Sequence, residues 1–198
     1  MLRSFLAVTA ILSLWLNQGE NKRFENRFFP QHVGDEWTYR KTGRLAQEGA
    51  GWTNKIVGNE KAFFKHSNYW GDDKERLIRI NKRGEVIEKT HSGPSLWYKL
   101  ADDVQGEWVL KLGVEGPPCV TDSRIKVVSG KETVEVPAGK FENCLKLEFS
   151  TNCNDAGVYQ QWFAPGIGLI RQTEETIAGP LISELVSAKI AGVVYPRK

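Results

Sequence analysis

Residues 160–176, with the sequence QQWFAPGIGLIRQTEET, decide the fold class. Apolar and polar residues nearly alternate on both sides of the Ala164-Pro165-Gly166 corner, and a period of two residues is typical of β-strands. Proline presets φ at the first corner position, and glycine adopts the unusual φ of the next. We therefore predict a β-hairpin with strands over 158–163 and 167–172. The segment has no nucleophile, metal ligand or phosphate-binding pattern.

The same alternation, broken by turn residues, continues through most of the 198-residue chain. Residues 181–190 alternate only in part and could pass for a helix, but the preceding turn residues and the neighbouring strands favour a strand. Further strands are predicted over 35–40, 77–80, 85–88, 96–100, 106–112, 124–128, 132–136 and 141–149. The fold class is therefore all-β with at most a minor α part, in one antiparallel domain of about ten to twelve short strands.

The amino terminus has the pattern of a secretory signal. Arg3 precedes an apolar run over 5–16, and polar residues follow at once. The run is too short for a membrane span of about 20 residues. The best small-residue cleavage sequence is Asn17-Gln18-Gly19, which is a poor match, so residues 1–19 are either a signal peptide or an uncleaved anchor. A buried or amphipathic helix is the alternative, and the lack of a polar face disfavours it.

This reading divides the chain into four parts and places the protein outside the cytoplasm. Residues 20–28 are a polar tether, 29–192 the antiparallel β domain and 193–198 a basic tail. The expected location is periplasmic or extracellular. We do not expect an integral membrane protein, apart from the N-terminal segment if it stays attached.

Charge argues against a nucleic-acid partner. The net charge is only +3, with 27 Lys and Arg against 24 Asp and Glu. The basic residues are spread along the chain, whereas nucleic-acid binders usually concentrate them on one face.

The three cysteines leave two alternatives open. Cys144 lies inside a predicted strand, about 20 Å along the chain from the strand's end. Bridged Cα atoms lie within about 7 Å, so a Cys144–Cys153 bridge would require the chain to double straight back. Cys119–Cys153 is the better pair if a disulfide forms, and three free thiols are the alternative. No C-x2-C or Cys/His cluster occurs, so we predict no metal site.

No constellation in the sequence indicates catalysis. The three histidines, His32, His66 and His91, are far apart in the sequence, and no G-x-S-x-G elbow occurs. We predict no catalytic residues and no cofactor.

Three motifs resemble those of a group of exported, largely uncharacterised bacterial β-proteins. They are F-P-x-x-V-G-x-x-W-x-Y (residues 29–39), V-P-A-G-x-F (136–141) and W-F-A-P-G-x-G (162–168). The resemblance covers about residues 29–186. It implies a curved, incompletely closed antiparallel sheet, broadly similar to the half-barrels of lipoprotein carriers, and brings no activity or cofactor. Several such proteins carry a lipidation cysteine near the signal, whereas this chain has none before Cys119, so a lipid anchor is not expected.

The aromatic residues are the feature of the sequence that most directly suggests a function, namely ligand binding. On the concave side of a curved sheet, large rings can line a pocket for an apolar or amphipathic ligand such as a lipid. The predicted ligand-binding residues are Trp37, Tyr39, Trp97, Trp108 and Trp162. The alternative is that these rings fill the core. The leading function is accordingly an exported, non-enzymatic, ligand-binding β-protein. A structural or interaction module of the cell envelope, which would bind another envelope protein, is second, and a hydrolase is third.

Overall fold

The computed structural model describes residues 25–101, 103–113, 119–151, 153 and 156–196. Within them the regular elements are all β-strands, and no helix is long and apolar enough to cross a membrane. The strands are β1 (Glu36–Thr42), β2 (Gly51–Glu60), β3 (Phe63–Ser67), β4 (Glu75–Ile80), β5 (Glu85–Thr90), β6 (Gly93–Lys99), β7 (Glu107–Val109), β8 (Arg124–Val136), β9 (Gly139–Ser150), β10 (Gly157–Ala164), β11 (Gly168–Glu175), β12 (Leu181–Ile190) and β13 (Val193–Tyr195).

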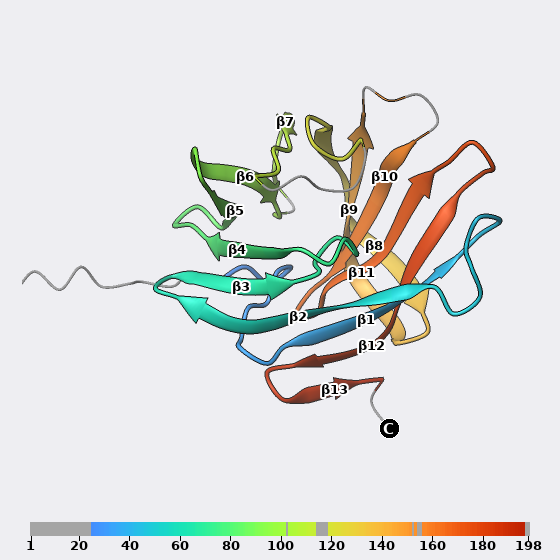
Figure 1. Cartoon of the computed structure of the whole chain (residues 1–198), viewed down its shortest axis with the longest axis horizontal. Helices are drawn as coiled ribbons and strands as arrows, with labels where there is room; N and C mark the ends of the chain where they lie inside the picture. The colour runs from blue at the N-terminus through green and yellow to red at the C-terminus, as the bar shows by residue number, and fades with distance from the viewer. Residues whose placement is uncertain (1–24, 102, 114–118, 152, 154–155, 197–198) are drawn as a thin grey trace, which may run out of the picture.

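The strands form one antiparallel sheet that curls nearly into a barrel (Figure 1). Their order is β6-β5-β4-β3-β2-β1-β12-β11-β10-β9-β8-β7, and β13 pairs with β12. The two ends, β6 and β7, meet at a single seam, where the Lys111 N–H donates to the Leu96 carbonyl over 3.4 Å and Ser95 Oγ donates to the Lys111 carbonyl over 2.6 Å. The predicted all-β, antiparallel, incompletely closed sheet is confirmed.

The predicted hairpin around Pro165 is also confirmed, as β10 and β11. The Ile167 N–H donates to the Ala164 carbonyl over 3.1 Å, and Gly166 has a φ of 73°. This is the geometry of a type II turn, whose third position requires a positive φ. Strands β10 and β11 then pair with two register shifts, one of them between Trp162 and Phe163.

Elsewhere the chain departs from the predicted strands. Ser129 and Gly130 do not separate two strands: they lie within β8, where three register shifts against β9 absorb the irregularity. Strands β2 and β3 were not predicted. The N-terminal tether region includes Phe28, which is completely buried, and residues 193–195 of the tail region form β13.

Cys119 and Cys153 form a disulfide with Cα atoms 5.8 Å apart, and Cys144 is a buried free thiol. The bridge connects the loop before β8 to the loop after β9, at the end of the sheet nearest the seam. It closes a loop of 34 residues that contains this whole hairpin.

Replacing both bridged cysteines with serine is expected to lower the free energy of unfolding by about 2–3 kcal/mol, because the unfolded chain regains the entropy of the open loop. Urea unfolding with and without a reductant measures the effect. The wild type under reducing conditions should match the double variant, whereas a Cys144→Ala variant should keep its sensitivity to reductant. Equal stability of wild type and double variant in oxidising buffer would refute the prediction.

Candidate functional site

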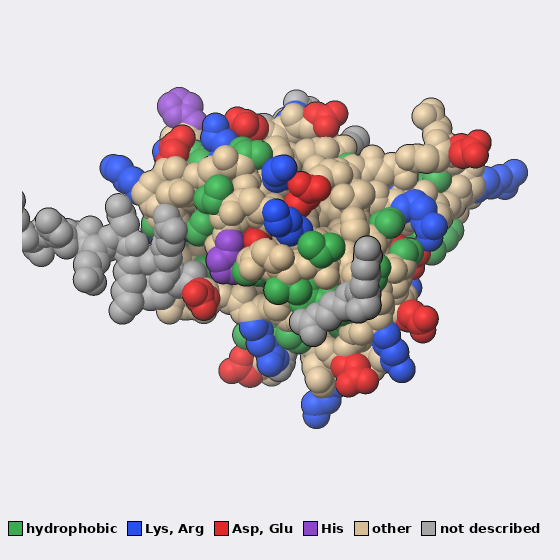
Figure 2. Space-filling view, turned by 90° about the horizontal axis from the view of Figure 1, so that it is seen from below, with side chains coloured by type: hydrophobic (Ala, Val, Ile, Leu, Met, Phe, Trp, Pro, Cys, Tyr) green, Lys and Arg blue, Asp and Glu red, His purple; other side chains and the backbone are tan. Residues whose placement is uncertain are grey.

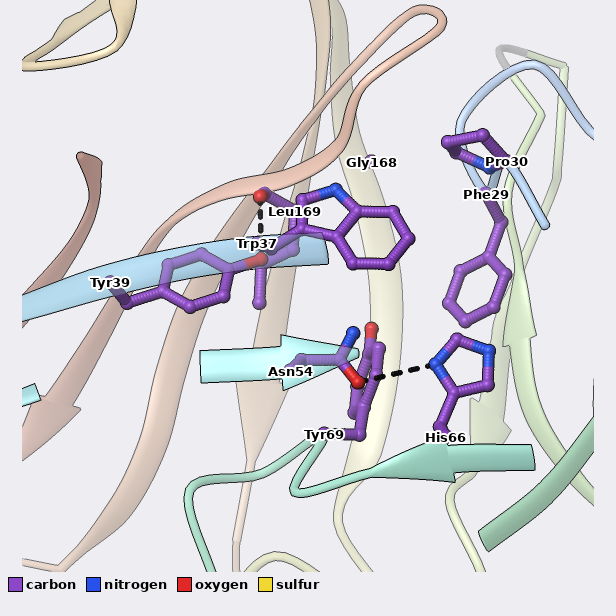
Figure 3. Close-up of a pocket in the computed structure, with 9 residues that line it drawn as sticks. All are labelled: Phe29, Pro30, Trp37, Tyr39, Asn54, His66, Tyr69, Gly168 and Leu169. Atoms are coloured by element: carbon purple, nitrogen blue, oxygen red, sulfur yellow. Dashed lines mark hydrogen bonds between the residues drawn. The ribbon is translucent and has the colours of Figure 1, made fainter. Parts of the chain in front are cut away.

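The motifs of the two ends of the chain meet on the inner face of the sheet. Trp37 and Tyr39 of β1 point towards β11, where the Tyr39 hydroxyl donates to the Leu169 carbonyl over 2.9 Å (Figure 3). The Trp37 indole N–H donates to the carbonyl of Ile167, in the turn just before β11, over 2.6 Å. Strand β11 pairs with β12 only over residues 171–174. The two aromatic side chains therefore tie the remainder of β11 to β1.

The third motif joins the same region from the other side. The turn between β8 and β9 places the Ala138 N–H 3.0 Å from the Leu185 carbonyl of β12, and Arg171 of β11 donates to the Glu135 carbonyl over 2.6 Å. All three motifs thus contribute to one junction around β11 and β12. Each of the three stretches supplies a contact that spans the sheet.

Trp97 and Trp108 lie near the seam and are also buried. The Trp108 indole N–H donates to the Trp97 carbonyl over 2.9 Å, and the Trp97 indole N–H donates to Glu88 Oε2 over 3.0 Å. The polar ends of both rings are therefore satisfied within the chain.

Trp162 lies on the opposite face of the sheet from these four residues. It pairs across β10 with Lys146 of β9 and Arg171 of β11, and its ring lies 5.1 Å from Lys146 Nζ and 5.9 Å from Arg171 Cζ. Both are cation–π distances. The structure therefore brings four of the five predicted ligand-binding residues to the inner face, and the assignment of all five to a ligand stays a prediction.

The interior that these rings surround is filled by side chains. The cavity in Figure 3 has a volume of about 10 Å³ and is lined by Phe29, Pro30, Trp37, Tyr39, Asn54, His66, Tyr69, Gly168 and Leu169. Such a volume accommodates about one water molecule. Among the described residues, this cavity offers no room for an acyl chain or a sugar.

His66 of β3 is the most unusual residue at this cavity. It is 1 % exposed, and its Nδ1 lies 3.3 Å from Asn54 Oδ1 while its Nε2 lies 3.3 Å from Gln31 Nε2. The neutral tautomer with a proton on Nδ1 satisfies both contacts. Burial lowers its pKa from 6.5 to about 3, because the imidazolium would lose its hydration.

A second buried polar cluster holds the seam. Glu88 of β5 accepts hydrogen bonds from Trp97 Nε1 and from the Gly113 N–H at 2.6 Å, and Arg76 of β4 lies beside it and forms an ion pair with Asp72. Burial raises the pKa of Glu88, against the opposing effect of its hydrogen bonds and of Arg76. The cluster ties β5, β6 and the segment after β7 together.

These buried groups do not form a catalytic set. Among the described residues, no hydrogen bond joins a histidine to another histidine, a hydroxyl or a thiol: His66 contacts two amides, and His32 Nδ1 lies 3.0 Å from Asp35 Oδ2. Nor do three or more His, Cys, Asp or Glu side chains of the described residues gather in a way that could hold a metal ion.

A larger hollow lies at the lower end of the sheet. We call it the lower groove; its volume is about 540 Å³. Figure 2 shows this side of the molecule, where hydrophobic side chains lie among charged ones. The apolar lining includes Phe29, Pro30, Phe64, Ile80, Ile190, Ala191 and Tyr195, and the polar lining includes Glu25, Asn26, Arg27, Gln31 and His32.

Asp35 fixes one wall of the lower groove. Its carboxylate is 2 % exposed and accepts hydrogen bonds from the Ala191 N–H over 2.7 Å and the His32 N–H over 2.9 Å. The other wall is held where the Gly166 N–H donates to the Arg27 carbonyl over 2.6 Å. These hydrogen bonds hold residues from the N-terminal and C-terminal parts of the described chain in place around the groove.

No family model matches the chain, and no curated protein matches it. Two solved structures are similar to it. One is a predicted lipoprotein from Parabacteroides distasonis, with 14% sequence identity and a TM-score of 0.48. The other is a predicted exported protein with a YmcC-like fold from Bacteroides fragilis, with 16% identity and a TM-score of 0.46. In each case the match covers 82% of this chain and 98% of the other.

Proposed function

We propose that this chain is an exported, non-enzymatic β-protein that binds a single-chain amphiphile, such as a long-chain fatty acid, in the lower groove. One observation carries the proposal: the interior cavity measures about 10 Å³, whereas the lower groove measures about 540 Å³. Ligand pockets usually measure about 300–1,000 Å³. The aromatic inner face then acts as the rigid core on which the groove is built.

The lining of the groove suits a molecule with one apolar and one polar end. Phe64 and Ile80 are contributed by β3 and β4, and Ile190 by β12, so apolar side chains approach from two sides. The polar part of the lining contains the basic side chains of Arg27 and His32 together with the carboxylate of Glu25, so the head group of the ligand would meet charges of both signs. Burial of the acyl chain would supply most of the free energy of binding.

An Ile80→Ala variant is expected to bind a fluorescent long-chain fatty acid about tenfold more weakly than the wild type, because the ligand loses apolar contact worth about 1.4 kcal/mol. Ile78→Ala is the matched control. Ile78 lies two residues earlier on the same face of β4 and is completely buried, but it does not line the groove. Fluorescence titration and native mass spectrometry give the two affinities. Absence of uptake by the wild type, or equal losses in both variants, would refute the proposal.

A second candidate function is a structural or interaction module of the cell envelope with no small ligand. The filled interior favours it, as do Val193 and Val194, which are exposed on the short strand β13 beside the groove. A wild-type protein that takes up no amphiphile but is captured by another envelope protein through β13 would support this alternative.

A further inference from the structure

The hairpin between β4 and β5 carries a second hollow, on the outer face of the sheet. Its volume is about 470 Å³, and it is lined by Arg79, Asn81, Lys82, Arg83, Ile87 and Pro94. We call this surface the basic corner. Its floor is apolar, and three of its six lining residues are cationic.

The positive charge of the basic corner is only partly neutralised. Arg83 forms an ion pair with Glu85 at 2.7 Å. Lys82 is exposed, and the Arg79 guanidinium lies 5.0 Å from the centre of the Phe63 ring while its Nε has no hydrogen-bond partner. Within the described part of the chain, neither Arg79 nor Lys82 forms an ion pair. The corner therefore presents two uncompensated positive charges beside apolar side chains, a combination that suits an anionic amphipathic surface.

The basic corner lies where the N-terminal segment joins the sheet. Asn26 Nδ2 donates to the Gly84 carbonyl of the same hairpin over 2.7 Å. In the sequence, the apolar run ends at Leu16, ten residues before Asn26, so the two are at most about 35 Å apart along the chain. Lys22 and Arg23 add positive charge to this connection. An apolar run that inserts in a bilayer would hold the corner close to the lipid head groups.

The lower groove opens beside the same corner. Asn26 lines the groove, and Ile80 of the groove is followed directly by Asn81 of the corner. Because successive residues of β4 point to opposite faces, Ile80 belongs to the inner side and Arg79 to the outer side of one strand end.

We propose that the basic corner docks on the anionic head groups of a phospholipid membrane, so that the lower groove opens next to the bilayer. This inference concerns where the molecule sits and does not depend on ligand binding in the groove. An acidic protein partner would match the charge equally well, but the adjacent entry of the N-terminal segment favours the membrane.

Flotation of the full chain with two kinds of vesicle tests the proposal. One kind is pure phosphatidylcholine, and the other contains phosphatidylglycerol. The apolar N-terminal run partitions into both, so the ratio of the two partition coefficients isolates the effect of charge. The variant Arg79→Gln/Lys82→Gln/Arg83→Gln is expected to lower this ratio at least about twentyfold, because each uncompensated basic residue near an anionic surface contributes a factor of about five.

Two further variants make the test specific. Lys82→Gln/Arg83→Gln leaves the partly buried Arg79 in place and should lower the ratio about fivefold. Arg44→Gln/Lys131→Gln/Lys140→Gln removes the same net charge from exposed positions outside the corner and should leave the ratio unchanged. Equal losses in both triple variants would overturn the proposal, as would a vesicle ratio of one for the wild type. Loss of polyglutamate binding in the corner variants, with an unchanged vesicle ratio, would assign the corner to an acidic protein instead.

Discussion

Replacing Trp37 with alanine is expected to lower the free energy of unfolding by about 4 kcal/mol, the largest effect of any single substitution that we consider. Trp37 is 4 % exposed and stacks on His66 at a ring-centre distance of 6.4 Å. Truncation removes this packing and leaves a cavity. It also removes the donor for the Ile167 carbonyl, so the contact between β1 and the β10–β11 turn is lost. Urea unfolding followed by circular dichroism measures the change.

A matched pair of variants separates the hydrogen bond from the packing. Trp37→Phe and Trp70→Phe both shorten a buried tryptophan, and the two residues are equally buried. The Trp70 indole N–H has no hydrogen-bond partner in the described residues. Trp37→Phe is therefore expected to cost about 1–2 kcal/mol more than Trp70→Phe, because only Trp37→Phe leaves a buried carbonyl without its donor. Equal costs would show that Trp37 only fills space.

Acidification from pH 6.5 to about pH 4 is expected to destabilise the protein by about 3 kcal/mol through His66 alone. In the folded state the pKa of His66 is lowered to about 3, so the ring stays neutral. In the unfolded state it takes up a proton below pH 6.5. The unfolded state thus binds more protons in this window. The free energy of unfolding therefore decreases by about 1.4 kcal/mol for each unit by which the pH is lowered. The loss is complete only below the folded pKa.

The comparison with His66→Gln isolates this contribution. Glutamine is neutral and can still donate a hydrogen bond to Asn54, so the variant should show a much flatter dependence of stability on pH between about 4 and 6.5. Glu88 acts with the opposite sign: burial raises its pKa, so its contribution to stability is lost as pH rises through that value. Its effect is common to both proteins and cancels in the difference. Parallel pH profiles for wild type and variant would contradict the buried neutral His66.

Strands could be predicted where apolar and polar residues alternate regularly. They could not be predicted where a buried polar residue breaks the alternation. Strands β10 and β11 flank a Pro-Gly corner and were predictable. Strand β2 was not, because Asn54 points inward between Trp52 and Ile56, and because the pairing with β3 shifts register after Ile56. The sequence alone shows neither a buried amide nor a bulge.

The site was harder to predict for a related reason. Asp35, His66 and Glu88 are polar residues that normally lie at the surface, and each is buried through contacts with residues distant in the sequence. Trp162 alternates with the buried Gln161 and Phe163 and so faces outward, where Lys146 and Arg171 cover its ring. The lower groove is made by both ends of the β domain, so no local pattern marks it.

The contacts of Trp37 and Tyr39 with β11 also bear on how the protein reaches its native state. Both hydrogen bonds join residues 130 positions apart, and β1 pairs with β12 near the end of the chain. Contacts this remote in sequence form slowly, because joining distant residues costs more loop entropy than forming the local hairpins of the sheet. During synthesis or translocation, β1 can pair with β2 at once, but its other edge has no partner until β12 has emerged. The sheet therefore stays open along that edge of β1, and its core stays incomplete, for as long as the C-terminal strands are withheld.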